Sequence, residues 1–240
     1  MRIAVLFDHL GPYHLARIRA AGTKHEILSV QVRLRSLEYR WQSPDLPEEI
    51  RQVTLQRTPG AATIPIHELV HGLDELVSGF RPEVCFISGW STRASFVALR
   101  WSLSRRIPVV LMSESSAHDE VRTPWREAVK RRYVALASAA LVGCTLHRAY
   151  LRELGMPDER IFDGYDAVDN ESFARESSRW RETDAPQPPC FLASNRFIEK
   201  KNLFRLLSAY ARYAHSATET EARPPWPLVL LGDGELKTKL

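Results

Sequence analysis

Cysteine is scarce in this chain, and long apolar runs are missing. Cys85, Cys144 and Cys190 are scattered over 240 residues and stand in apolar segments. We therefore expect buried thiols in a reducing cytoplasm, not a disulfide-stabilised secreted scaffold. No run of 18 apolar residues occurs, so no transmembrane helix is predicted. The first apolar run is broken by Asp8 and indicates a strand, not a signal peptide.

Two patterns of nucleotide sites are also missing. The loop after the first apolar run holds Gly11 alone, whereas an NAD enzyme has G-x-G-x-x-G there, so hydride transfer is not expected. The chain contains no D-x-D, which leaves a metal-bridged nucleotide-sugar site of that type without support. No set of Cys and His has the spacing of a zinc site. The sequence thus predicts no bound metal and no cofactor.

One stretch does imitate a metal motif. His67 to His71 reads H-E-x-x-H, the helical pair of many zinc peptidases. Zinc would need both imidazoles on one face, the glutamate as base and a third ligand. The two histidines instead align with Asp74, Glu75 and Ser78, opposite the Leu/Val stripe of the helix. We interpret the stretch as a solvated helix face.

The composition is that of a soluble globular protein, with 44% hydrophobic and 26% charged residues. A net charge of +4 favours anionic ligands or an acidic membrane surface but does not require nucleic acid, and no nucleic-acid partner is expected. The basic, aromatic segment from Trp125 to Tyr133 leaves peripheral contact with the inner face of the membrane open. A solvated helix face is the more common cause of such a pattern.

Short apolar strands alternate with amphipathic helices along most of the chain. Strands are expected over 3–7, 25–32, 52–55, 84–87, 109–112, 140–142 and 161–162. Helices are expected from Pro12 and over 66–80, 92–104, 125–137 and 146–154, and residues 33–49 are interpreted as a long loop. This rhythm predicts an α/β fold whose Rossmann-like parallel sheet is covered by helices on both faces.

The rhythm stops at a charged, proline-containing segment. We predict an N-terminal domain over 1–172, a linker over 173–188, and the start of a second Rossmann-like domain over 189–240. The second domain has one strand–helix–strand unit, ending in Gly232-Asp233-Gly234. About fifty residues do not bury a normal core. We therefore expect a fragment, truncated within its second domain, or a lobe that leans on a partner.

The segment from Pro189 to Leu207 predicts a strand, a polar turn and a helix, with Asn202 as N-cap. Arg196 and Lys201 both fall at the carboxyl end of the strand, which is the ligand-binding edge of a parallel sheet. Two cations and a helix N-terminus at one place suit a diphosphate. The alternative is that both are solvated loop charges.

Two other loops follow strand ends. Gly11 permits close approach of the backbone to a phosphate, and His14 in the first helical turn is a candidate donor to an anion or else a surface histidine. After the 109–112 strand, the polar segment 112–120 contains Glu114, His118 and Asp119. These groups suit hydrogen bonding to a hydroxylated substrate or general base catalysis. An ordinary polar loop that caps the next helix is the alternative.

Three stretches together resemble glycosyltransferase family 4 (glycosyl transferases group 1), the retaining enzymes with the two-lobed GT-B fold. Residues 154–170, LGMPDERIFDGYDAVDN, are similar to the family's segment that enters the hinge. Residues 195–203, NRFIEKKNL, resemble its "GRLxxxKNL" turn, and 230–236, LLGDGEL, resemble its "LVGDGPL" strand end. The likeness covers most of the chain from Ala140 on and is weaker before it, where Gly11 to His14 matches the first-strand loop.

The resemblance implies hexosyl transfer, with retention, from a nucleotide-sugar donor to a glycan or lipid-linked acceptor in polysaccharide assembly. By this resemblance Arg196 and Lys201 hold the donor diphosphate, the loop from Gly11 to His14 faces the donor, and the acceptor sits on the first lobe. Many members carry a histidine where this chain has Glu114, which implies that Glu114 or His118 substitutes for it.

Two other functions stay open at this point. The paired-glutamate motif of the family lies beyond the GDG strand and is not in this chain, so we expect little or no activity from these residues alone. A non-catalytic nucleotide-sugar-binding or interaction module is one alternative. A nucleotide-sugar epimerase of the same fold is the other.

Overall fold

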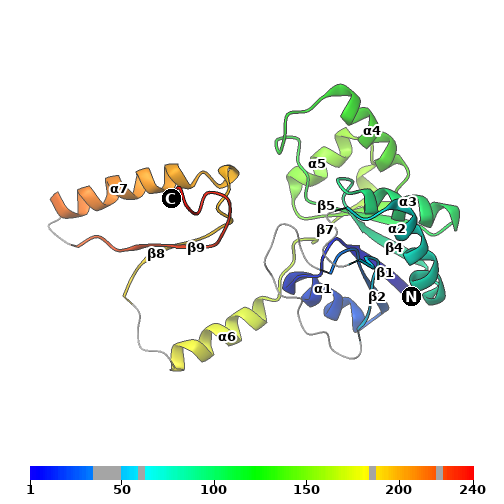
Figure 1. Ribbon diagram of the computed structural model, residues 1–240, viewed down its shortest axis with the longest axis horizontal. Coiled ribbons are helices and arrows are strands. Elements are labelled where there is room, and N and C mark those ends of the chain that lie inside the picture. The colour runs from blue at the N-terminus through cyan, green and yellow to red at the C-terminus, as the bar shows by residue number, and fades with distance from the viewer. Residues whose placement is uncertain (35–49, 59–62, 184–187, 220–223) are drawn as a thin grey trace. The chain divides into compact units, whose positions relative to one another are not determined.

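The computed structural model describes residues 1–34, 50–58, 63–183, 188–219 and 224–240. The chain divides into two compact units, Met1–Phe173 and Ala174–Leu240, here called unit 1 and unit 2 (Figure 1). Most of the loop predicted over 33–49 lies outside the described residues. Within the described part of the chain, no helix is both long enough and apolar enough to cross a membrane.

Unit 1 is built on a seven-stranded sheet in which every neighbouring pair is parallel. Its strand order is β3-β2-β1-β4-β5-β6-β7. The strands are β1 (Arg2–Phe7), β2 (Glu26–Gln31), β3 (Arg51–Thr54), β4 (Val84–Ser88), β5 (Val109–Ser113), β6 (Ala139–Val142) and β7 (Ile161–Asp163). The predicted Rossmann-like parallel sheet is confirmed.

Helices connect these strands. They are α1 (Pro12–Gly22), α2 (Ile66–Gly72), α3 (Arg93–Ser104), α4 (Pro124–Ala135) and α5 (Thr145–Glu153). Helix α1 begins at Pro12, where the missing amide costs nothing. Helix α3 begins after Thr92, whose hydroxyl oxygen accepts a hydrogen bond of 3.1 Å from the Ser95 amide. Helix α2 continues as a π-helical turn (Leu73–Val77) and then as a 3-10 turn (Ser78–Phe80).

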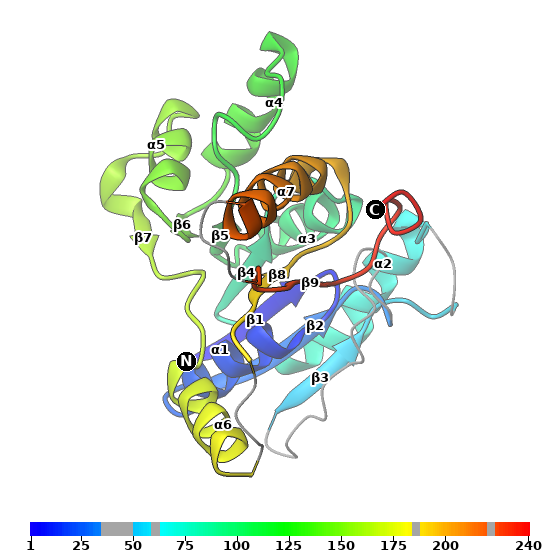
Figure 2. The same cartoon turned by 90° about the vertical axis from the view of Figure 1, so that its left-hand side faces the viewer.

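The core lies on both faces of the sheet. Alternate residues of β1 show this, because Ile3 and Phe7 join a buried cluster with Ile18 of α1, while Leu6 joins the larger cluster on the other face. The larger cluster draws on α2, α3, α4 and α5. Figures 1 and 2 show α1 on one side of the sheet and α3 on the other. Leu111 in β5 is completely shielded, at 0% exposure.

The segment that the sequence predicts as a linker is largely helical. Residues Asn170–Thr183 form α6. Asp169 accepts a hydrogen bond of 2.8 Å from the Ser172 amide and so caps the helix. The helix contains neither glycine nor proline, and its charged residues are compatible with a solvated helix. The sequence predicted a linker over 173–188 without a helix, so α6 is an element that the sequence analysis missed.

The expectation that all three thiols are buried was also wrong. Cys85 is buried, but Cys144 and Cys190 are exposed. Cys144 immediately precedes α5, and Cys190 immediately precedes the first strand of unit 2. Each cysteine therefore lies just outside a regular element and not on its buried face.

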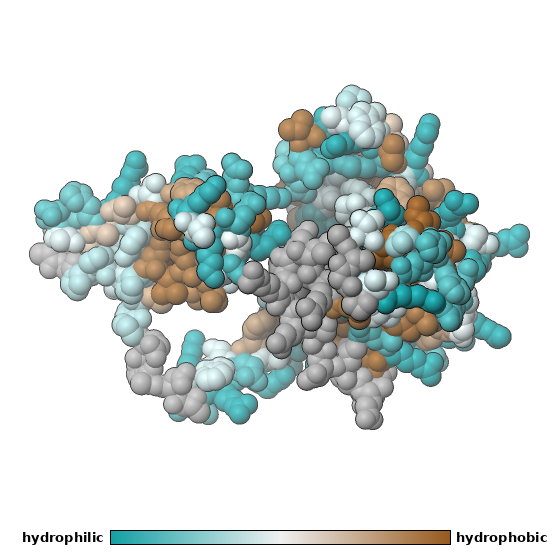
Figure 3. Space-filling view, in the orientation of Figure 1, coloured by the Kyte–Doolittle hydropathy of each residue, from teal (hydrophilic) through white to brown (hydrophobic). Residues whose placement is uncertain are grey.

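Besides most of α6, the described residues of unit 2 include two parallel strands and the long helix α7. The strands are β8 (Phe191–Ser194) and β9 (Leu228–Leu231), and the helix is α7 (Leu203–Glu219). Three buried residues, Phe197, Leu203 and Leu236, form its core. The strands expose apolar side chains, with Leu192 at 64% and Leu231 at 59% exposure. Figure 3 shows the resulting hydrophobic patch over these strands.

Candidate functional site

The loops that follow β1, β5 and β7 begin at the carboxyl edge of the unit 1 sheet. In the strand order, β1 lies between β2 and β4. The chain therefore adds β2 and β3 on one side of β1 and the strands from β4 to β7 on the other side. Ligands of open parallel sheets bind at such a switch point, outside the carboxyl ends of the strands. The side chains on these loops therefore define the candidate site.

Glu114 is the first residue after β5, and its carboxyl group lies against that of Asp166, in the loop after β7. The pKa of Glu114 is raised to about 7, first because partial burial disfavours its charged form. A hydrogen bond to the Asp166 carboxylate and the negative charge of Asp166 raise it further, while the positive charge of Arg17 opposes the shift. At neutral pH the carboxyl group of Glu114 therefore carries a proton for part of the time. A carboxyl group in this state can give or take a proton near pH 7.

Gly143 leaves space for the Asp166 carboxylate, and the backbone of β6 holds the loop that carries it. A Cβ atom at Gly143 would lie 1.7 Å from Asp166 Oδ2, so the carboxylate occupies the space that a side chain would take. Gly164 begins the turn with φ +107°, a conformation that glycine adopts without strain. The amides of Gly164 and Tyr165 both donate to the Val142 carbonyl at 3.0 Å. The Asp166 loop is thus tied to the end of β6.

Arg17 reaches the same loop from α1. Its Nε donates to the Ala167 carbonyl at 2.9 Å, and its guanidinium lies 4.8 Å from the centre of the Tyr165 ring. Arg17 Nη1 is buried and has no hydrogen-bond partner among the residues that the structure describes. Burial, followed by the charge of Glu114, raises the pKa of the Tyr165 hydroxyl to about 12, so it stays protonated at neutral pH. The cluster of Glu114, Asp166 and Arg17 is called the carboxyl pair site below.

Gly11 and His14 form a closed turn at the start of α1. The Gly11 amide donates to His14 Nδ1 at 3.0 Å, and the His14 ring stacks on Phe7 with 4.2 Å between ring centres. Burial, and then the positive charge of Arg17, lower the pKa of His14 to about 4. The imidazole is therefore uncharged at neutral pH, and its Nδ1 already accepts from Gly11. His14 supplies no positive charge to an anion here.

His118 lies apart from this cluster. Its side chain is exposed, its amide donates to Ser116 Oγ at 3.3 Å, and no described contact joins it to Glu114 or Asp166. Asp119, another candidate in this loop, accepts from the Ser116 amide at 2.7 Å and from Ser116 Oγ at 3.0 Å. The two hydrogen bonds give Asp119 a role in shaping the turn, and a catalytic role for Glu114 and His118 stays a prediction.

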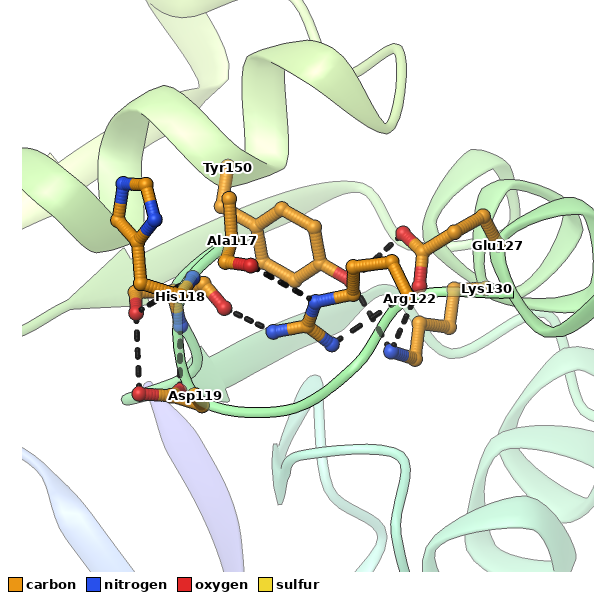
Figure 4. A network of polar contacts seen from close by, with 8 residues as sticks. Ala117, His118, Asp119, Arg122, Glu127, Lys130 and Tyr150 are labelled. Carbon is orange, nitrogen blue, oxygen red and sulfur yellow. Dashed lines mark hydrogen bonds and ion pairs between the residues drawn. The ribbon is translucent and has the colours of Figure 1, made fainter. Parts of the chain in front are cut away.

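A polar network holds the end of the loop that carries these residues (Figure 4). Tyr150 of α5 donates to Glu127 at 2.7 Å and receives a hydrogen bond of 3.0 Å from Lys130, both of α4. Arg122 lies 4.5 Å above the Tyr150 ring and donates to the Ala117 carbonyl at 3.1 Å. The network anchors residues 116–122 between two helices.

In unit 2, Arg196 and Lys201 lie on the turn between β8 and α7, as predicted. That turn is locked to the one after β9, because Phe197 donates to the Asp233 carbonyl at 2.8 Å and the Leu236 amide donates to the Phe197 carbonyl at 2.9 Å. A Cβ at Gly232 would lie 1.8 Å from the Asn195 carbonyl oxygen, which leaves no room for a side chain. The two turns form one rigid edge.

Asn202 precedes α7 in a left-handed conformation, with φ +49°. Its main-chain carbonyl accepts from the amides of Arg205 and Leu206, at 3.1 and 3.3 Å. The backbone of Asn202 thus starts the helix, and asparagine is among the residues that tolerate this conformation best.

The helical H-E-x-x-H stretch is engaged in surface contacts. Glu68 accepts a hydrogen bond from the Arg57 amide, and His71 lies 3.9 Å from Glu75. His67 and His71 are exposed. Over the residues that the structure describes, no three His, Cys, Asp or Glu side chains gather in a way that would hold a metal ion.

Sequence reasoning missed Asp166, Arg17 and Gly143. Asp166 stands within the segment that carries the family resemblance, but its partner Glu114 follows a different strand. Neither local spacing nor helical periodicity pairs two loops across a sheet. A weak signal was available, because Gly143 stands directly beyond one predicted strand and Gly164 two residues beyond another, where a close approach of chain segments is common.

Residues 14–162 match the family model described as a glycosyl transferase 4-like domain. The match covers more than half of the chain and includes Arg17, Glu114 and Gly143. The chain belongs to this family. No protein in the comparison with curated sequences matched it.

Solved structures share the fold. Sucrose-phosphate synthase from Thermosynechococcus elongatus is 16% identical with a TM-score of 0.61, and the match covers 95% of this chain and 61% of that one. UDP-N-acetylglucosamine 2-epimerase from Rickettsia bellii is 17% identical with a TM-score of 0.54, covering 99% and 62%. Anabaena Alr3699/HepE, solved with UDP and glucose, is 16% identical with a TM-score of 0.57, covering 100% and 63%. The chain thus spans about three fifths of the length of these neighbours.

Proposed function

We propose that this chain is part of a retaining glycosyltransferase that transfers a sugar from a nucleotide-sugar donor to a glycan or lipid-linked acceptor. The observation that carries the proposal is the glycosyl transferase 4-like match over 14–162, which contains Arg17 and Glu114 of the carboxyl pair site. Neighbours of the same fold, solved with UDP, UDP-N-acetylglucosamine or UDP and glucose, support a nucleotide sugar as donor.

On the donor side we assign Arg196 and Lys201 to the diphosphate. Both follow β8 at the carboxyl edge of their strand, and the locked turns of unit 2 give them a fixed backbone frame. Positive groups at this place would stabilise the charge that develops on the leaving diphosphate as the glycosidic bond breaks. No metal is required in this assignment, since the cations come from the side chains.

On the acceptor side we assign Glu114 to the reacting hydroxyl. Its raised pKa suits proton exchange at neutral pH. His118, which is exposed on the same loop, is assigned to the outer part of the acceptor. The turn from Gly11 to His14 forms the loop after β1, and because its imidazole is uncharged we assign it no electrostatic attraction for phosphate.

The test is binding of UDP to the purified chain by isothermal titration calorimetry. Arg196→Ala should weaken binding by about 1.5–3 kcal/mol, the range for a hydrogen bond to a charged group. Arg212→Ala, which removes an exposed arginine of α7, is the matched control and should leave the dissociation constant unchanged. Equal affinity of the Arg196→Ala variant and the unsubstituted chain would remove Arg196 from the donor site.

A 2-epimerase is the second candidate, because several of the structural neighbours are UDP-N-acetylglucosamine 2-epimerases. The carboxyl pair site would then exchange a proton with sugar carbon, not with an acceptor hydroxyl. Incubation with UDP-N-acetylglucosamine in deuterated water, without acceptor, separates the two. Deuterium in the recovered sugar would establish the epimerase, whereas an unlabelled sugar favours the transferase.

A further inference from the structure

The carboxyl pair site brings together side chains from three separate elements. Glu114 comes from the loop after β5, Asp166 from the loop after β7, and Arg17 from α1. We propose that this site binds two neighbouring hydroxyl groups of a neutral sugar acceptor, with Asp166 positioning the sugar and Glu114 receiving a hydroxyl proton. The inference rests on the proposed function, because it names the acceptor class of that transferase.

The charge of the site favours a neutral ligand. The two carboxyl groups of Glu114 and Asp166 lie against the single guanidinium group of Arg17. A phosphate or carboxylate placed here would meet the negative pair at close range and gain little from an arginine that is already neutralised. A sugar ring brings no charge and avoids that cost.

The hydrogen-bonding groups of the site match a pair of hydroxyls. Each hydroxyl both donates and accepts. The carboxylate oxygens of Glu114 and Asp166 accept, and Arg17 Nη1 is a buried donor without a partner in the described part of the chain. A hydroxyl that accepts from Arg17 and donates to a carboxylate would complete this set, since buried polar groups are rarely left unpaired.

The groups around Glu114 set its protonation. Asp166 and Tyr165 face it from the loop after β7, and Arg17 faces it from α1. The Tyr165 hydroxyl stays protonated, and the neighbouring His14 is uncharged at neutral pH. Asp166 thus acts on Glu114 as well as on the ligand, which makes it a positioning residue with an electrostatic role.

The transfer step balances with these groups alone. The O–H bond of the acceptor breaks and its proton passes to a carboxylate oxygen of Glu114, while the oxygen forms a bond to the anomeric carbon of the donor sugar. The bond from that carbon to the diphosphate breaks, and the diphosphate leaves with the electron pair. Glu114 later releases the proton to water.

The test uses the isotope-labelled full chain and NMR titration with the methyl α-glycosides of glucose, mannose and galactose, and separately with inorganic phosphate. At least one glycoside should shift the backbone amides of 114–119 and 164–169, and phosphate should not. Asp166→Asn and Glu114→Gln should each weaken that glycoside by about tenfold or more, as for loss of a charged hydrogen bond. Asp169→Asn, a matched change in the same loop at the cap of α6, should leave its affinity unchanged.

The inference is wrong if no glycoside shifts these amides, if phosphate shifts them instead, or if Asp169→Asn weakens the glycoside as much as Asp166→Asn does. UDP titration of the same samples separates this result from the donor assignment. Loss of UDP binding with intact glycoside binding contradicts the transferase and leaves the sugar site standing. The reverse pattern contradicts the sugar site alone.

Discussion

Both units use a glycine to let two loops meet at the carboxyl edge of a parallel sheet, but they fill the space differently. In unit 1, the space beside Gly143 is taken by the carboxylate of Asp166, a side chain that can rotate. In unit 2, the space beside Gly232 is taken by the main-chain carbonyl of Asn195, which cannot. The candidate acceptor site therefore depends on side-chain chemistry, whereas the candidate donor site depends on backbone geometry.

The shielding of the two sheets differs as well. Leu111 in unit 1 is fully buried between helices and neighbouring strands, and Leu192 in unit 2 is 64% exposed. Unit 1 thus has the interior of a self-contained domain, and unit 2 draws its stability from a few residues around Phe197.

The largest effect should come from the interior of unit 1. Leu111→Ala should lower the free energy of unfolding by about 2–5 kcal/mol, because it leaves a cavity under a central strand. Leu192→Ala, the matched change in the first strand of unit 2, should stay within about 0.5 kcal/mol, as expected for an exposed site. Urea denaturation measures both, and equal losses would contradict the contrast in shielding.

The two glycines provide the next comparison. Gly232→Ala should cost about 1–3 kcal/mol, since the new methyl group meets a fixed carbonyl and the glycine has φ +157°. The loss of stability in the Gly232→Ala variant should appear as faster hydrogen exchange at the amides of Phe197 and Leu236.

Gly143→Ala should cost less than about 1 kcal/mol, because Asp166 can turn away. Its effect should appear in the site, where the pKa of Glu114 falls toward the ordinary value of 4.5 once Asp166 has left. Carboxyl 13C NMR measures that pKa. A large loss of stability with an unchanged Glu114 pKa would show that Asp166 cannot rotate.

The smallest effect concerns the pH dependence of unit 1. The pKa of Glu114 is raised from 4.5 to about 7, so its contribution to stability is complete below pH 4.5 and is lost as pH rises to 7. The pKa of His14 is lowered from 6.5 to about 4, so its contribution is complete above pH 6.5 and is lost as pH falls to 4. Between pH 4.5 and 6.5 the two slopes oppose each other.

Glu114→Gln should therefore make stability rise more steeply with pH over this window than it does in the unsubstituted chain, and His14→Gln should make it rise less or fall. Urea midpoints at several pH values give both slopes. The changes should be modest, because Glu114 is exposed on one side and water screens its charge. Slopes that move in the same direction in both variants would contradict the assignment.

The sheet was predictable and the site was not, for a physical reason. Apolar runs such as Val84–Ile87 record burial on both faces of a strand, and burial is a local property of the sequence. The pairing of Glu114 with Asp166 depends on strand order, which no local pattern contains. His14 was predicted as a candidate donor to an anion, but burial and Arg17 leave it neutral. The helix over 170–183 was missed because the charged, proline-containing segment 173–188 was interpreted as a linker.

Arg17 has a consequence for how the chain folds. Its bond to the Ala167 carbonyl joins residues separated by 150 positions, from the first helix to the loop after the last strand of the sheet. Contacts of such long range pay the full entropy of loop closure and form late. The carboxyl pair site is therefore complete only after the seventh strand has docked, so the proposed binding of a sugar would report that unit 1 has finished folding.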